Sequence, residues 1–307
     1  MNQIITPSQA VQLLLEAAVP ERTPEFRRLW KTYSPSVEIA GDTRGFTFNA
    51  NKRRILFQHK ALDVLWIIGF SAWESIATYS PAIAIALGTS KRLEDALGDD
   101  EERGQIEMHY KTRLVAAREI IESNDTDPSV WPQDVPQPGL NRSSASIETA
   151  SAYDLTLLAT AFVLFHEFRH VMLDRDSQRP ADPAEEELLC DTWARDFMTN
   201  KLAAYAQAHG HSYSQVLNKR AAAMALGSLM LHEITPIATH GGVPFEYPPL
   251  AARIRAITGT VTLPEDATYW IYAACLLVGA LRRQHRTLDI VTNSPRRLVE
   301  SLIAMFD

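Results

Sequence analysis

The residues that are best suited to chemistry are those of the stretch HEFRH, at positions 166–170. On a helix, His166 and His170 lie on the same face, one turn apart. Two imidazoles at this spacing can bind one Zn²⁺ ion with bonds of about 2.0–2.1 Å. Glu167 would project beside that ion, which suits a general base acting on a water molecule. The stretch therefore predicts a zinc site with a base next to it.

A catalytic zinc site takes three protein ligands and leaves its fourth position for water. The third ligand that the sequence offers is Glu187. Helix-start signals precede it, because Asp182 is a good N-cap and Pro183 suits the first helical position. Asp191 follows Glu187 by one turn. If this helix packs against the first, Asp191 can accept a hydrogen bond from a ligand histidine and fix its tautomer.

Other side chains compete for these roles. Glu186 as the ligand would put Cys190 where the orienting carboxylate is needed, which favours Glu187. Cys190 is a soft ligand in principle, but a small apolar residue of a helix core is the better interpretation. Asp176 stands where a longer zinc motif has a third histidine, and without the glycine turn of that motif it stays a minor alternative ligand. The acidic run 185–187 can also be a solvated first helical turn, and HEFRH alone can occur by chance.

These motifs resemble a known pattern. HExxH at 166–170 followed by ExxxD at 187–191 is similar to the gluzincin class of zinc metallopeptidases. The resemblance implies a zincin-like fold, with two antiparallel zinc helices and a small sheet whose edge strand holds an extended peptide. Strands within 36–57 can supply such an edge by β-augmentation. It also implies hydrolysis of a peptide bond at one Zn²⁺ ion per chain.

A later stretch extends the resemblance. Residues 247–257, YPPLAARIRAI, resemble the HPP-x-x-x-R-I element of minimal gluzincins, with Tyr247 in place of the leading histidine and Arg253 retained. The layout is similar to that of the Lit-like phage-exclusion peptidases of family U49. This resemblance rests on residues 155–257, and it implies a role in phage defence through cleavage of a host protein.

A peptidase of this kind needs a donor that stabilises the oxyanion formed on the substrate. The candidates are Tyr247, His240 in the loop THGG, and His232 at a helix end. Each of these residues is also compatible with a structural or exposed role. We expect Arg253 to hold the YPP loop against the zinc helices through a carboxylate.

The composition limits the classes of function. The chain of 307 residues has a formal net charge of −7 and no dense Lys/Arg stripe, which argues against nucleic-acid binding. Two cysteines, Cys190 and Cys275, cannot form a disulfide framework for this length, so we expect a reducing, cytoplasmic setting. The N-terminus lacks a signal-peptide pattern. Charges and a proline interrupt the apolar stretch 61–87, so we interpret it as a core helix and expect no stable membrane insertion.

The elements that must position the site are mostly helices. We expect an α+β fold that is mostly α, with a small antiparallel sheet at 36–57. Helices are expected at 7–18, 60–87, 91–123, 152–173, 183–208, 212–233, 249–257, 265–286 and 296–306. Residues 124–149 contain four prolines and form a linker or a lid. We predict an N-terminal region 1–125, a loop 126–149 and a helical zinc-site region 150–307, together one compact domain.

The sequence therefore predicts a cytoplasmic zinc endopeptidase that acts on a protein or peptide substrate. An ungated peptidase would be toxic, so we expect control by the irregular segment or by a regulatory protein partner. Two other functions stay open. One is a degenerate or zinc-binding peptidase fold that acts as a sensor or protein-interaction module, which Tyr247 favours and Glu167 disfavours. The other is a different metal-dependent hydrolase of a peptide-like bond.

Overall fold

The computed structural model describes residues 5–41, 43–98, 101–124, 128–138, 145–234, 249–258 and 263–306. It is mostly helical with one small sheet near the N-terminus, which confirms the predicted α+β class. The helices are α1 Pro7–Ala18, α2 Thr23–Tyr33, α3 His59–Thr89, α4 Leu93–Leu97, α5 Glu101–Glu122, α6 Ile147–Asp176, α7 Pro183–Thr199, α8 Leu202–His209, α9 Tyr213–Ile234, α10 Leu250–Thr258, α11 Thr268–Arg283 and α12 Pro295–Ile303, with short 3-10 turns η1 Pro20–Arg22 and η2 Pro128–Val130. Buried apolar side chains from α1 to α12 form one contiguous core.

Two predicted helices are divided in the structure. Residues 183–208 form α7 and α8, because the backbone of Lys201 leaves the helical conformation between them. The predicted helix 91–123 is divided into α4 and α5, since Gly98 follows α4 with a φ of 54°. Only glycine adopts such an angle without a steric cost, so Gly98 ends the first helix.

The three strands form a mixed sheet in the order β1-β3-β2, with β1 Ser36–Ala40, β2 Phe48–Asn51 and β3 Arg54–Gln58. β2 and β3 are antiparallel, as expected, because a two-residue turn joins them. β1 pairs with β3 in parallel, which departs from the wholly antiparallel sheet that we predict from the sequence. The connection after β1 leads to β2 at the far edge of the sheet. The chain then returns as β3 between β1 and β2, and β3 runs in the same direction as β1.

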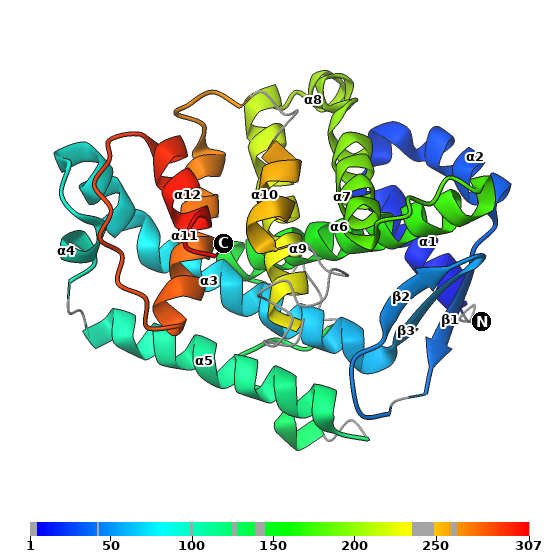
Figure 1. Cartoon of the computed structure of the whole chain (residues 1–307), viewed down its shortest axis with the longest axis horizontal. Coiled ribbons are helices and arrows are strands. Elements are labelled where there is room, and N and C mark those ends of the chain that lie inside the picture. The colour runs from blue at the N-terminus through cyan, green and yellow to red at the C-terminus, as the bar shows by residue number, and fades with distance from the viewer. Residues whose placement is uncertain are drawn as a thin grey trace.

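Helix α6 carries the HEFRH motif and runs along the molecule toward the sheet, where α7 crosses it (Figure 1). Its neighbours α3 and α9 approach it through glycines. A Cβ atom at Gly227 of α9 would lie 2.8 Å from the ring of Phe162, and one at Gly69 of α3 would lie 2.6 Å from a methyl of Thr156. These close contacts leave α6 little freedom to shift, which suits a helix that must hold metal ligands.

The crossing of α6 and α7 is packed by aromatic side chains beneath the motif. Phe168 is fully buried, and its ring lies 6.2 Å from Trp193 of α7 and 6.0 Å from Phe26 of α2. Trp193 stacks on Phe197 one turn further along α7, with 5.0 Å between the ring centroids. Large rings buried at such distances contribute strongly to packing. They therefore fix how α7 is rotated relative to α6.

Two of the described helices, α3 and α6, are long and apolar enough to cross a membrane. Within the apolar windows, 67% of the α3 residues and 50% of the α6 residues are buried in the fold. A core helix passes the same test of length and composition, so these two helices are weak evidence for a membrane span.

Within the predicted linker or lid 124–149, residues 128–138 lie against α3 and α5, whereas residues 147–149 already belong to α6. Trp66 of α3 donates its indole N–H to the carbonyl of Pro136 at 2.7 Å. Arg113 of α5 is 4% exposed and binds Asp134 at 2.6 Å. These contacts seat residues 128–138 on the helical core.

Candidate metal centre

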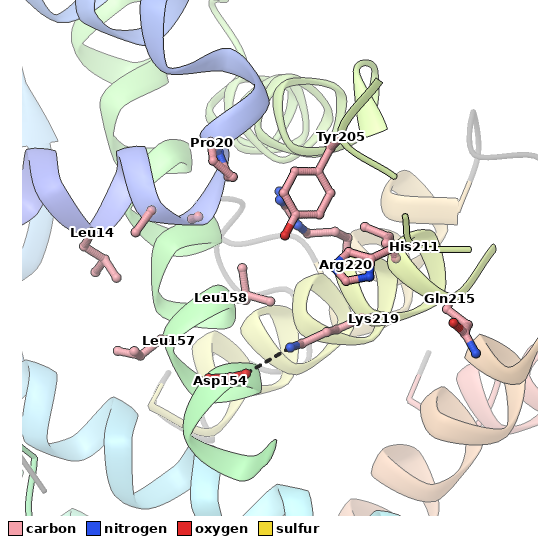
Figure 2. A pocket seen from close by; sticks show the side chains of 13 residues that line it. Leu14, Pro20, Asp154, Leu157, Leu158, Tyr205, His211, Gln215, Lys219 and Arg220 are labelled. Atoms are coloured by element: carbon pink, nitrogen blue, oxygen red, sulfur yellow. Dashed lines mark hydrogen bonds and ion pairs between the residues drawn. The ribbon is translucent and has the colours of Figure 1, made fainter. Parts of the chain in front are cut away.

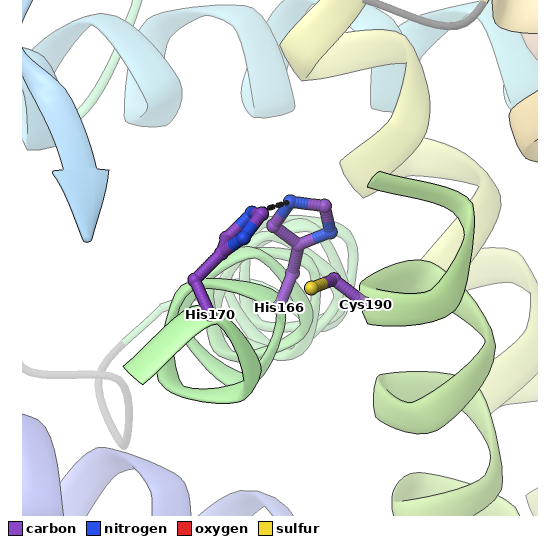
Figure 3. A group of neighbouring side chains, drawn as sticks. All are labelled: His166, His170 and Cys190. Carbon is purple, nitrogen blue, oxygen red and sulfur yellow. Dashed lines mark hydrogen bonds between the residues drawn. The ribbon is translucent and has the colours of Figure 1, made fainter. Parts of the chain in front are cut away.

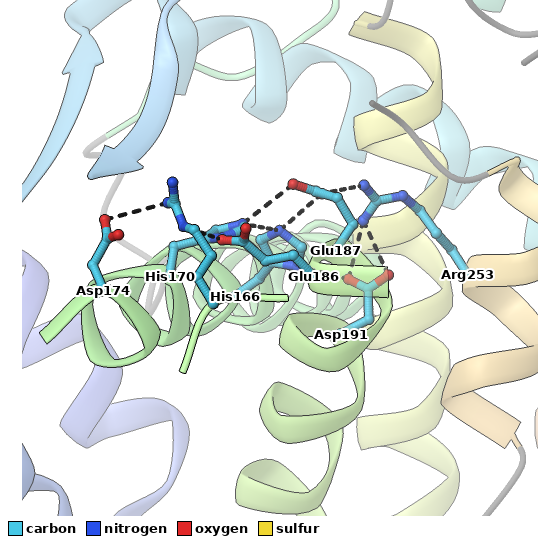
Figure 4. Close-up of polar contacts among 8 residues, drawn as sticks. His166, His170, Asp174, Glu186, Glu187, Asp191 and Arg253 are labelled. Atoms are coloured by element: carbon cyan, nitrogen blue, oxygen red, sulfur yellow. Dashed lines mark hydrogen bonds and ion pairs between the residues drawn. The ribbon is translucent and has the colours of Figure 1, made fainter. Parts of the chain in front are cut away.

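The side chains of three residues from α6 and α7 meet at one point. His166 Nε2 and His170 Nε2 lie 3.1 Å apart, and the two carboxylate oxygens of Glu187 lie 3.2 and 3.3 Å from them (Figure 4). Four ligands bonded to zinc at about 2.0–2.1 Å in a tetrahedron lie roughly 3.3 Å from each other. The spacing of the three donors therefore fits a single ion.

The opposite nitrogen of each ring faces a carboxylate. His166 Nδ1 lies 2.8 Å from Oδ1 of Asp191, which is fully buried, and His170 Nδ1 lies 2.5 Å from Oε1 of Glu186. With the proton on Nδ1 held by these carboxylates, the lone pair of each ring is on Nε2, at the point where the donors meet. We assign these tautomers from the hydrogen-bond network.

Glu186 contacts a candidate ligand histidine, and the sequence alone did not indicate this pairing. In the sequence, Glu186 stands out only as a competitor of Glu187 for the ligand position. A signal was available, because two ligand histidines need two partners and Asp191 supplies one. Consecutive residues on a helix point about 100° apart, so Glu186 and Glu187 cannot face the same atom.

Arg253 of α10 joins the two predicted carboxylates. One guanidinium nitrogen lies 3.0 Å from both oxygens of Asp191, and the other lies 2.7 Å from Oε2 of Glu187. Arg253 is 5% exposed, so these charge-assisted bonds are formed away from water. The arginine thereby ties the start of α10 to the face of α7 that meets the histidines.

Glu167 is buried beside this cluster, with 7% of its surface exposed. Burial raises the pKa of its carboxyl to about 6, while the neighbouring histidine charges lower it and the charge of Glu187 raises it. A carboxyl group with this pKa can both accept and release a proton near neutral pH. Its place next to the paired histidines is the one expected for the base.

The centre has an excess of negative charge. Its carboxylates are those of Glu167, Glu186, Glu187 and Asp191, and the guanidinium groups beside them are those of Arg179 and Arg253. With these four carboxylates ionised and both histidines neutral, the two arginines leave two negative charges unbalanced, and Asp174, which also pairs with Arg179, adds a third. Burial alone would lower the pKa of His166, but the charges of Glu187 and Asp191 outweigh it and raise that pKa to about 10. The field around the rings thus favours positive charge.

Cys190 offers a second possible donor set. His166, His170 and Cys190 have ligand atoms within 4.8 Å of one another, and all three residues are buried. In Figure 3 the sulfur lies near the base of His166, away from the line that joins the two ring nitrogens. Burial, together with the surrounding carboxylates, raises the pKa of the Cys190 thiol. Because a thiolate is the metal-binding form, this environment favours Glu187 over Cys190 as the third ligand.

The other predicted residues that the structure describes, His232 and Asp176, have their contacts away from the centre. Tyr247 and His240 lie outside the described residues. His232 packs edge-on against Phe306, with 5.6 Å between the ring centroids. Asp176, the minor alternative ligand, is exposed at the end of α6 and accepts a hydrogen bond from the Tyr33 hydroxyl at 2.8 Å.

A separate cavity of about 490 Å³ lies between α1, α6, α8 and α9 (Figure 2). Its polar wall includes Lys219, which pairs with Asp154 at 3.1 Å, and Arg220, which is 3.4 Å from Glu21. Asp154 precedes His166 by twelve residues, or about 18 Å along the helix. The cavity is therefore distinct from the candidate metal centre.

The Peptidase U49 family model matches residues 55–273 of this chain. The chain belongs to the Peptidase U49 family. The match confirms the resemblance to this family that the motifs indicate, and it extends well beyond residues 155–257 in both directions. It covers α6, α7 and α10 with every described residue of the candidate metal centre, and it leaves β1 and β2 outside. No curated protein and no solved structure matches the chain.

Proposed function

We propose that this member of the Peptidase U49 family is a zinc-dependent endopeptidase with His166, His170 and Glu187 as metal ligands and Glu167 as the general base. The observation that carries the proposal is the meeting of three donors 3.1–3.3 Å apart, next to a buried carboxyl group. When bound there, zinc would polarise the carbonyl of the scissile peptide and acidify a water molecule.

Other residues of the chain would transfer the proton and orient the ligands. Glu167 takes a proton from the attacking water and delivers it to the nitrogen of the leaving amine. Asp191 and Glu186 hold the Nδ1 protons of the histidines, which leaves both Nε2 lone pairs free to bind a metal ion. Arg253 fixes the carboxylates of Glu187 and Asp191 in place.

The substrate side of the proposal rests on β2. Among the described residues β2 pairs only with β3, so its other edge has backbone groups available, and β2 lies beside α6. An extended peptide can add to such an edge through main-chain hydrogen bonds. We therefore propose a protein or peptide substrate bound along β2, in agreement with the edge strand that the gluzincin resemblance implies.

The cellular setting is also a proposal. Both cysteines of the described chain are free and buried, which is compatible with a reducing cytoplasm. The motif resemblance to phage-exclusion peptidases supports a role in phage defence, with control by a partner or by the segment 124–149. We also propose that the protein binds no nucleic acid and does not insert stably into a membrane.

The test compares Glu167→Gln with the wild type. The amide keeps nearly the same shape but cannot take a proton, so the variant should retain one zinc per chain and lose cleavage. Zinc is measured by elemental analysis of the purified chain, and cleavage is measured by proteomics of new protein N-termini in cells that express each form. Cleavage by Glu167→Gln would refute the proposed base.

His166→Ala distinguishes the alternative function. It should lose both zinc and cleavage if the chain is a metallopeptidase. A cellular effect that survives Glu167→Gln but disappears in His166→Ala would identify a zinc-dependent binding module instead.

A further inference from the structure

Arg179 lies in the short connector between α6 and α7, in none of the motifs that the sequence analysis used. Its Nε atom lies 2.9 Å from Oε1 of Glu186, and one of its terminal nitrogens lies 3.3 Å from Oδ2 of Asp174. The guanidinium group therefore bridges the first turn of α7 and the last turns of α6. A planar fork of donors suits such a bridge between two carboxylates.

The contact with Glu186 connects Arg179 to the metal centre. The same oxygen of Glu186 that binds Arg179 also lies 2.5 Å from Nδ1 of His170. Arg179 thus constrains the carboxylate that in turn orients the His170 ring. His166 has an equivalent arrangement, because Arg253 binds the Asp191 carboxylate that orients it. Each ligand histidine therefore contacts a carboxylate that in turn pairs with an arginine. Figure 4 shows Asp191 between His166 and Arg253.

The contact with Asp174 connects Arg179 to the sheet. Oδ2 of Asp174 also accepts a hydrogen bond of 2.5 Å from the backbone N–H of Lys52, in the turn between β2 and β3. Lys52 has a φ of 35°, in a region that non-glycine residues adopt at a cost in free energy. The Asp174 bond helps to hold the turn in that conformation, so the same carboxylate links Arg179 to the end of β2.

We infer that Arg179 is a positioning residue that acts through Glu186 to hold His170 in the orientation that binds the metal. The inference rests on the proposed metal site and assigns a role to a side chain outside the ligands and the base. A purely structural alternative is that Arg179 only fastens the connector between the helices. The two roles differ in whether metal affinity depends on Arg179 through Glu186.

The test measures zinc affinity of the purified full-length chain by competition with a chromophoric chelator. Loss of a direct partner of a ligand histidine typically weakens metal binding about 10–100-fold, which is the expectation for Glu186→Gln. Arg179→Gln should weaken it about three- to tenfold, since Arg179 acts one step further out and its side chain is 42% exposed. Arg179→Lys should recover part of the loss, because it keeps the charge without the planar fork.

The double variant decides between the two roles. If Arg179 acts through Glu186, then Arg179→Gln should weaken zinc binding little further once Glu186→Gln is present, because the two changes break one connection. Arg175→Gln is the matched control. Arg175 is exposed on the last turn of α6, its hydrogen bond to the Thr32 carbonyl is 3.5 Å long, and its loss should leave zinc affinity unchanged.

Wild-type zinc affinity in both Arg179→Gln and Arg179→Lys, or fully additive effects in the double variant, would overturn the inference while leaving the zinc site intact. If the wild type itself binds no zinc, the proposed function fails, and the inference fails with it. Thermal unfolding of each variant without metal separates a loss of affinity from a loss of folding. Should Arg179→Gln not fold, Arg179→Lys and its double variant with Glu186→Gln carry the same comparison.

Discussion

Replacement of Arg253 by glutamine tests whether the metal centre is as strongly charged as the structure indicates. The side chain is 6% exposed and pairs with Asp191, which is 0% exposed, and with Glu187, which is 17% exposed. Glutamine can keep one hydrogen bond but not the charge, so two carboxylates lose their cation in a buried place. Removal of one partner from a buried ion pair costs about 3–5 kcal/mol. That is a large share of the roughly 5–15 kcal/mol by which a folded protein is stable.

Urea denaturation of Arg253→Gln and wild type in the presence of EDTA measures this loss as a difference in the free energy of unfolding. The difference should become smaller in excess zinc, because the bound cation supplies positive charge to Glu187. Arg296→Gln is the matched control, since the Arg296–Glu300 pair is about half exposed and such pairs contribute about 0–1 kcal/mol. A loss below about 1 kcal/mol for Arg253→Gln in EDTA, or an equal loss with and without zinc, would refute the reasoning.

Three further predictions concern the metal centre and the packing of α6. Asp191→Asn should weaken zinc binding about 10–100-fold in a chelator competition, because the amide can donate to the imidazole nitrogen and favour the wrong tautomer; unchanged affinity would contradict the assigned tautomer. Glu187→Gln should lose most bound zinc in elemental analysis whereas Cys190→Ala should keep it, and the reverse result would assign the third ligand to the thiol. Gly227→Ala should destabilise the fold by about 1–3 kcal/mol in denaturation, since the added methyl lies 2.8 Å from a ring of α6; wild-type stability would show that the two helices can move apart.

The sequence predicts those parts of the site that depend on short-range spacing within a helix. The spacing of His166 and His170 needs only a helix, and the start of the second helix is marked by Asp182, whose side chain caps it by accepting a bond from the N–H of Ala184. Because Glu187 and Asp191 are one turn apart, they share a face once that helix is assumed. The structure brings these four predicted site residues together, along with Arg253 from a later helix.

The remaining features depend on how distant segments meet. The pairing of Glu186 with His170 follows from the rotation of α7 about its own axis, which depends on the packing of the Trp193 and Phe197 rings as well as on the polar contacts. The parallel pairing of β1 with β3 depends on the path of the chain after β1, where no turn motif fixes the direction. Cys190 is buried in the core, as expected. It also lies close to the two histidines, because it is on the same helix as Glu187 and Asp191, next to Asp191.

One helix crossing therefore specifies most of the centre. Both histidines and Glu167 come from α6, while Glu187 and the two carboxylates that orient the histidines come from α7. A small rotation of α7 would move all three carboxylates at once, so their contacts with the histidines depend on one helix orientation. The aromatic packing around Phe168 and the ion pairs of Arg253 and Arg179 resist this rotation. A substitution in this aromatic packing is consequently as able to weaken metal binding as a substitution of a polar partner, although it touches no donor atom.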